Sequence, residues 1–136
     1  MSRARILLAD DHKDMRDRVV RVLEKDFDLL DAVADGQSLL EAASQLNPDL
    51  CLMDVSMPVL NGFETATRLR KSGSKAKIVF LSIHEDVDFV RAAFAVGASA
   101  YVVKRRLASD LSQAIRAALS GGTFTSSMAV GDGESD

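Results

Sequence analysis

The sequence alternates five times between a short apolar run and a longer segment in which apolar residues recur every three or four positions. The apolar runs are continuous, as in parallel strands that are covered on both faces. They occupy residues 6–9, 29–34, 50–53, 78–81 and 100–103. Strand and helix in this alternation predict an open α/β sheet with right-handed crossovers.

Residues that end helices separate these units. Asn47-Pro48 ends the second predicted helix, because the residue before a proline is pushed out of the helical region. Ser72-Gly73-Ser74 ends the third helix and Gly97 the fourth. Asp86 and Ser109 are the predicted N-caps of the fourth and fifth helices. About 120 residues suffice for five such units. The expected fold is a flavodoxin-like five-stranded parallel sheet of order 2-1-3-4-5, flanked by five helices.

Composition fits one soluble domain of 136 residues, with 47% hydrophobic and 27% charged residues. We expect a domain over residues 1–120 and a linker or flexible C-terminal tail over residues 121–136, which is rich in glycine, serine and acidic residues. The net charge of -3 argues against non-specific nucleic-acid binding. A single cysteine, Cys51, and no run of transmembrane length favour a cytoplasmic protein without membrane contact.

Acidic residues stand at the ends of two predicted strands. Asp10-Asp11 follow the first strand, and Asp54 follows the third. In this strand order the winding reverses between those two strands, which is where open α/β sheets bind ligands. Close carboxylates repel one another unless they share a cation or keep a proton. Their oxygen atoms suit Mg²⁺, which favours a partner phosphate.

Ser82 and Lys104 end the fourth and fifth predicted strands and should face the same edge of the sheet. A hydroxyl and an ammonium group supply what the oxygens of a phosphoryl group need, and a carboxylate can form an aspartyl phosphate. Taken singly, an Asp or Ser here is more often a turn residue or cap, and a Lys is more often solvated. Their conjunction at four of five strand ends favours a phosphoryl-transfer site.

Four stretches resemble the response-regulator receiver domain of two-component signalling, and the resemblance covers residues 3–120. They are residues 7–12, residues 54–62, Phe80-Leu81-Ser82 and residues 98–104. Arg105-Arg106 follow Lys104, where many receivers have proline. Together with Ala9-Asp10-Asp11-His12, this feature resembles the NarL/FixJ-type subgroup.

The resemblance implies that Asp54 accepts a phosphoryl group from a histidine kinase. Mg²⁺ would be held by oxygen atoms of Asp10, Asp11, Asp54 and the backbone carbonyl of Ser56. Lys104 would contact the phosphoryl group, and Ser82 would turn to bond it. Tyr101 would act as an aromatic switch that packs inward when Ser82 moves. The fourth helix, fifth strand and fifth helix would then form the altered partner surface, which could include a homodimer contact.

Receivers of this subgroup usually precede a helix-turn-helix domain, and the sequence contains none. We therefore expect no direct nucleic-acid binding by this chain and control of DNA only through a missing output domain. A single-domain receiver acting through protein contacts is the alternative. In either case the chain is expected to phosphorylate and dephosphorylate itself rather than to turn over a substrate.

Three other classes fit less well. Aspartyl-nucleophile phosphohydrolases of the haloacid-dehalogenase type have Asp-x-Asp after the first strand, whereas Asp10 and Asp11 are adjacent. A mononucleotide binder would need a first loop rich in Gly, Ser or Thr. A phosphorylation-independent interaction domain would be marked by loss of Asp54, Asp11 or Lys104, and all are present.

Two histidines lie beside the predicted site. His84, two residues after Ser82, could influence water access to a phosphorylated Asp54, but a polar loop residue is the preferred interpretation. His12 is interpreted as part of the helix start rather than as a metal ligand.

Overall fold

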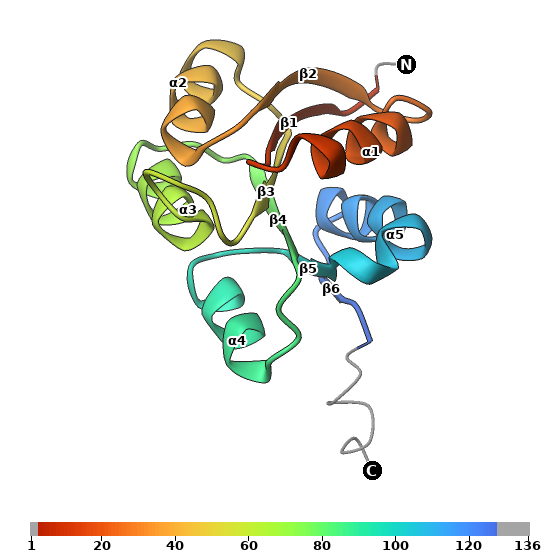
Figure 1. Cartoon of the computed structure of the whole chain (residues 1–136). Helices are drawn as coiled ribbons and strands as arrows, with labels where there is room; N and C mark the ends of the chain where they lie inside the picture. Colours follow the sequence, from red (N-terminus) through yellow and green to blue (C-terminus); the bar gives the residue numbers. More distant parts are fainter. Residues whose placement is uncertain (1–2, 128–136) are drawn as a thin grey trace.

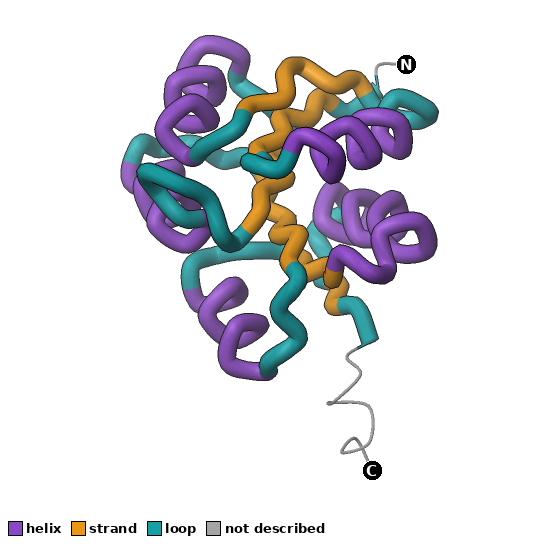
Figure 2. Tube along the Cα trace, viewed as in Figure 1, coloured by secondary structure: helices purple, strands orange, loops and turns teal. Residues whose placement is uncertain are grey.

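The computed structural model describes residues 3–127, which form one parallel sheet covered on both faces by helices (Figures 1 and 2). The strands lie in the order β2-β1-β3-β4-β5-β6. Their bounds are β1 (Arg5–Ala9), β2 (Asp28–Val33), β3 (Leu50–Asp54), β4 (Lys77–Ser82), β5 (Ala100–Val103) and β6 (Phe124–Thr125). The expected order of the first five strands is confirmed.

The expected count of five strands is wrong, because a short sixth strand pairs with the edge of β5. Phe124 pairs with Ala100, and Thr125 pairs with Tyr101, both in parallel. The sequence gives no strand signal here, since two residues between glycines and serines are too few to show a period. The division at residue 120 stays a prediction, and residues 128–136 of the predicted tail lie outside the described residues.

Five α-helices connect the strands, as expected. They are α1 (Lys13–Leu23), α2 (Gly36–Leu46), α3 (Gly62–Lys71), α4 (Val87–Ala95) and α5 (Leu107–Leu119), with a 3-10 turn at Lys104–Arg106. Helices α1 and α5 cover one face of the sheet, and α2, α3 and α4 cover the other (Figure 1). Each face buries its own apolar core, so β1, β3, β4 and β5 are almost fully enclosed, whereas the edge strand β2 is only partly buried.

Most predicted helix boundaries are confirmed. Asn47 ends α2 in the left-handed region at φ 53°, and Gly97 follows α4 at φ 99°. Asp86 is the N-cap of α4. The prediction for Ser109 is wrong: this residue lies inside α5, whose N-cap is Arg106. The chain enters α5 directly from the 3-10 turn, so no extended residue precedes the helix to act as a side-chain cap.

Across residues 3–127 none of the helices combines the length and the apolar character that crossing a bilayer requires. The parallel arrangement has a more important consequence for function. It places the carboxyl ends of β1, β3, β4 and β5 at one edge of the sheet, where the loops that follow these strands come together.

Candidate functional site

The centre of this edge is a buried ion pair between the ends of two strands. Asp54 is the last residue of β3, and Lys104 is the first residue after β5. Lys104 Nζ lies 2.8 Å from Asp54 Oδ2 and 3.2 Å from Asp10 Oδ2, at the end of β1. All three residues are buried, with relative exposures of 4% for Asp54, 8% for Lys104 and 0% for Asp10. The fold therefore brings together three of the residues that the sequence singled out.

Local turns aim the two carboxylates. Asp54 Oδ1 accepts a hydrogen bond from the backbone N–H of Ser56 at 3.0 Å, and Asp10 Oδ1 accepts one from the N–H of His12 at 2.9 Å. These are the local bonds that favour Asp at the start of a turn. Each carboxylate thus uses one oxygen to shape its own loop and presents the other to Lys104.

Close packing of α3 fixes the loop after β3. The N–H of Gly62 donates to the carbonyl of Val55 at 2.7 Å, which draws the start of the helix against the strand end. A Cβ at Gly62 would lie 2.4 Å from the backbone oxygen of Asp54, so only glycine fits. A capping box between Asn61 and Glu64 then starts α3, and the three-residue spacing of these two side chains is a signal that is visible in the sequence.

Burial and charge act against each other in this pair. Burial raises the pKa of Asp54, assisted by the nearby Asp10 carboxylate, although the bonds from Lys104 and Ser56 partly offset it. Burial alone would lower the pKa of Lys104, but the carboxylates of Asp54 and Asp10 outweigh it and raise this pKa. Lys104 is therefore held as a cation beside the two carboxylates.

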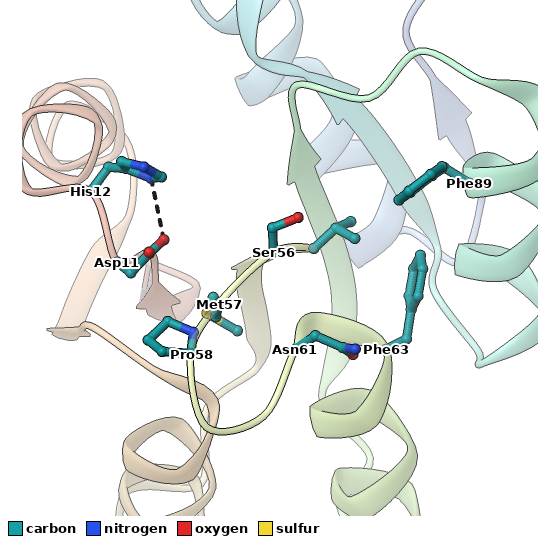
Figure 3. Close-up of a pocket in the computed structure, with 9 residues that line it drawn as sticks. Asp11, His12, Ser56, Met57, Pro58, Asn61, Phe63 and Phe89 are labelled. Atoms are coloured by element: carbon teal, nitrogen blue, oxygen red, sulfur yellow. Dashed lines mark ion pairs between the residues drawn. The ribbon is translucent and has the colours of Figure 1, made fainter.

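The same carboxylates are suited to a cation. Ligand atoms of Asp10, Asp11, His12 and Asp54 all lie within 4.8 Å of one another. Asp10 Oδ2 is buried and makes no hydrogen bond in the described part of the chain, although it lies 3.2 Å from Lys104 Nζ as an ion pair. An acceptor-rich cluster whose buried oxygen makes no hydrogen bond fits a hard divalent cation such as Mg²⁺. Asp11 is exposed at the mouth, and its Oδ1 lies 3.2 Å from His12 Nδ1 (Figure 3).

Ser82 and Tyr101 lie together behind this centre. Ser82 Oγ accepts a hydrogen bond from the N–H of His84 at 3.0 Å, and the Ser82 side chain acts to lower the pKa of the Tyr101 phenol. The phenol in turn donates to the His84 carbonyl at 2.7 Å. Tyr101 is fully buried, and burial raises its pKa. The tyrosine is therefore already packed inward, with Ser82 bonded to its own loop.

A cleft opens beside the acidic centre. Figure 3 shows Asp11 and His12 on one side of it and Phe63 and Phe89 on the other, with Ser56 between them. The His84 ring stacks on Phe89 with centroids 4.1 Å apart, and its Nε2 lies 3.3 Å from Ser56 Oγ. From its place in the sequence, His84 is expected to be chiefly a polar loop residue. Neither contact of His84 can be predicted from spacing in the sequence. Both arise because the fold brings the loop after β4 against α4 and against the loop after β3.

Comparison with known proteins agrees with this geometry. The family model of the response regulator receiver domain matches residues 6–116. Transcriptional regulatory protein DegU of Brevibacillus brevis is 34% identical over 125 residues, which are 90% of this chain and 53% of that protein. Nitrate/nitrite response regulator protein NarL of Escherichia coli K12 is 34% identical over 120 residues, 87% of this chain and 56% of that protein. The chain thus spans about half the length of these relatives.

Solved structures show the same likeness. A LuxR-family two-component response regulator from Aurantimonas sp. SI85-9A1 has a TM-score of 0.86 at 32% identity, covering 90% of this chain and 89% of the other. The signal receiver domain of the putative response regulator NarL from Mycobacterium tuberculosis has a TM-score of 0.85 at 25% identity. That match covers 89% of this chain and 99% of the other.

Proposed function

The chain belongs to the response regulator receiver domain family, as a receiver of the NarL/LuxR kind, and from this premise we propose that Asp54 is its phosphoacceptor. The phosphodonor is the phosphohistidine of a histidine kinase. One observation carries the proposal: the buried 2.8 Å contact between Lys104 Nζ and Asp54 Oδ2 beside the carboxylate of Asp10. A lysine that only contributed a surface charge would be solvated, and it would not be buried beside two carboxylates.

In the transfer step, a carboxylate oxygen of Asp54 attacks the phosphorus atom of the donor. The bond between phosphorus and the donor's histidine nitrogen breaks, and its electron pair stays on the imidazole, which then takes a proton from water. The product is an aspartyl phosphate. Lys104 neutralises the attacking carboxylate before the reaction and is within reach of a phosphoryl oxygen after it.

Mg²⁺ is the proposed cofactor, and Asp10, Asp11, Asp54 and the backbone carbonyl of Ser56 would hold it. Bound there, it would offset the negative charge that accumulates between the donor phosphoryl group and the carboxylates. The cluster of ligand atoms within 4.8 Å and the buried Asp10 Oδ2 support this assignment. The chain's chemistry is on itself, so it is not proposed to turn over a substrate.

Ser82 and Tyr101 are the proposed switch. Ser82 now bonds the N–H of His84 and would exchange that bond for a phosphoryl oxygen. The loop that carries His84 also holds the Tyr101 phenol, so its movement alters the surface formed by α4, β5 and α5. The proposed readers of that surface are a second copy of the chain or a DNA-binding output domain. The names of two relatives, a transcriptional regulatory protein and a nitrate/nitrite response regulator, are consistent with such an output.

Incubation with acetyl phosphate and Mg²⁺, followed by intact-mass measurement, tests the proposal. The wild type should gain one phosphoryl group, and Asp54→Asn should gain none. Asp14→Asn makes the same charge change at an exposed position on α1 and should behave as the wild type. An adduct of equal yield in Asp54→Asn rules out Asp54 as the phosphoacceptor.

A further inference from the structure

The two residues that follow β6, Ser126 and Ser127, are hydrogen-bonded to the residues on both sides of Lys104. Ser126 follows β6 and is buried, with 3% of its surface exposed. Its Oγ accepts a hydrogen bond from the N–H of Val103 at 3.2 Å. On the other side, Arg105 donates to the backbone oxygen of Ser127 at 3.2 Å. The active-site lysine is thus flanked, in sequence, by two contacts to the segment 124–127.

At the end of β5, the Ser126 side chain supplies the acceptor that a neighbouring strand would supply with a backbone carbonyl. The ladder between β5 and β6 ends with the bond from the Ser126 N–H to the Tyr101 carbonyl at 2.9 Å. Beyond that point the N–H of Val103 is fully buried and meets the Ser126 side chain instead of a further backbone carbonyl. A buried N–H needs a partner, so this hydroxyl fixes where β5 ends. Lys104 is the next residue.

The side chain of Ser126 also acts on α5. Asp110 of that helix is 5% exposed and accepts a hydrogen bond from Arg106 Nε at 2.9 Å. Burial alone would raise the pKa of Asp110, but the side chains of Arg106, Ser126 and Ser109 lower it. Ser126 therefore bonds to β5 and influences a buried carboxylate of α5.

A second connection reaches the loop after β4. Arg105 donates from Nε and from a terminal nitrogen to the two carboxylate oxygens of Glu85, at 2.7 and 2.8 Å. The same guanidinium contacts the carbonyl of Ser127. Figure 1 shows β6 beside β5, with which it pairs in parallel at the edge of the sheet.

We propose that Ser126 is a positioning residue for phosphoryl transfer: by closing the end of β5, it fixes the point from which Lys104 reaches Asp54. This inference rests on the proposed function. The segment 124–127 then supports the site that reacts, through the position of Lys104, in addition to extending the chain beyond α5. The proposed Mg²⁺ ligands lie on β1 and β3 and in the loops after them, so none of them belongs to β5 or to the segment 124–127.

Because Lys104 and the proposed Mg²⁺ ligands lie at the ends of different strands, phosphorylation rate and Mg²⁺ binding can be compared in variants of the full chain. Ser126→Ala should slow phosphorylation by acetyl phosphate roughly tenfold, since a small displacement of a positioned group has effects of this order or larger. Its Mg²⁺ affinity, measured by calorimetry, should not fall below that of the wild type, because a displaced ammonium no longer competes for the carboxylates of Asp54 and Asp10. Ser126→Thr keeps the hydroxyl and should restore the rate. Ser127→Ala, at the exposed neighbour, should match the wild type, because the contact at Ser127 uses its backbone.

A rate in Ser126→Ala within about twofold of the wild type overturns the inference, and so does an equal fall in rate and Mg²⁺ affinity. If Ser126→Ala does not fold, hydrogen exchange of the wild type decides. If the Ser126 contact favours phosphorylation, phosphorylation must in turn favour that contact, because the coupling between two sites is reciprocal. Exchange at the Ser126 amide should therefore slow when acetyl phosphate and Mg²⁺ are added. Unchanged or faster exchange overturns the inference. A wild type that takes up no phosphoryl group defeats the proposed function instead.

Discussion

The ammonium of Lys104 lies 2.8 Å from the carboxylate of Asp54, a residue 50 positions earlier in the chain. This contact joins the ends of β3 and β5, which are separated in the sheet by β4. A second buried carboxylate, that of Asp10, lies 3.2 Å from the same ammonium. One buried ammonium is therefore shared by two buried carboxylates.

Removing the lysine charge should slow phosphorylation far more than it affects folding. We expect Lys104→Met to reduce the rate with acetyl phosphate by roughly 100-fold, the usual order for loss of one group that stabilises developing charge. Lys75→Met, at an exposed position before β4, should leave the rate unchanged. Quenched time courses read by intact mass measure both rates. Equal rates in Lys104→Met and the wild type would show that the ammonium does not act on the phosphoryl group.

Asp54→Asn should be more stable than the wild type at neutral pH without divalent cations. The pKa of Asp54 is raised above 3.8 in the folded state, mainly by burial. Folded protein therefore binds this proton more tightly than unfolded protein, and the wild type loses stability as pH rises through the raised pKa. The advantage of Asp54→Asn should shrink as pH falls through that pKa and vanish below 3.8. Urea unfolding in EDTA measures this difference in unfolding free energy, with Asp14→Asn as the control. A lower stability of Asp54→Asn would mean that the ion pair with Lys104 outweighs the cost of burying the Asp54 carboxylate.

Mg²⁺ should stabilise the folded chain through the acidic cluster. At a concentration 100-fold above its dissociation constant, a ligand of the folded state adds about 2.7 kcal/mol. We expect Asp11→Asn to need at least about tenfold more Mg²⁺ for the same effect, since loss of an oxygen ligand weakens binding by this order. Asp14→Asn, three residues further along, should respond as the wild type. Thermal unfolding across a Mg²⁺ titration gives the comparison, and equal shifts in all three proteins would place the cation elsewhere.

Gly62→Ala should disturb the site through the backbone. Its Cβ would lie 2.4 Å from the Asp54 carbonyl oxygen, a rigid neighbour, so the start of α3 must move. Overpacking of this kind costs about 1–3 kcal/mol of unfolding free energy. Gly122→Ala, whose Cβ would meet its nearest atom at 3.4 Å, is the matched control. Urea unfolding should separate the two variants; equal stabilities would mean that the loop after β3 tolerates displacement.

Much of the fold is readable from the sequence because its signals are local. Continuous apolar runs mark the enclosed strands, and Asn47 and Gly97 end helices in backbone regions that suit those residues. For five such units the doubly wound order 2-1-3-4-5 is the economical choice, and the first five strands of the structure have it. The proximity of Asp10, Asp54 and Lys104 is a consequence of that order, which is why the sequence alone anticipates it.

Other features depend on contacts that no sequence period encodes. The strand β6 is two residues long and exists because the edge of β5 is available to it. The stacking of His84 on Phe89 arises from the way that one loop folds over α4. Ser109 resembles an N-cap in sequence, yet the 3-10 turn after Lys104 moves the start of α5 to Leu107. Ser126 gives no signal, because its importance comes from the buried N–H of Val103.

The most direct measurement locates the phosphoryl group. Borohydride reduces an acyl phosphate to an alcohol, so treatment of the phosphorylated chain should convert the modified aspartate to homoserine. Peptide mapping by tandem mass spectrometry should then find homoserine at position 54, with Asp10 and Asp11 unaltered. Homoserine at position 10 or 11, or phosphate retained on a histidine with Asp54 intact, would contradict the assignment of Asp54 as the residue that reacts.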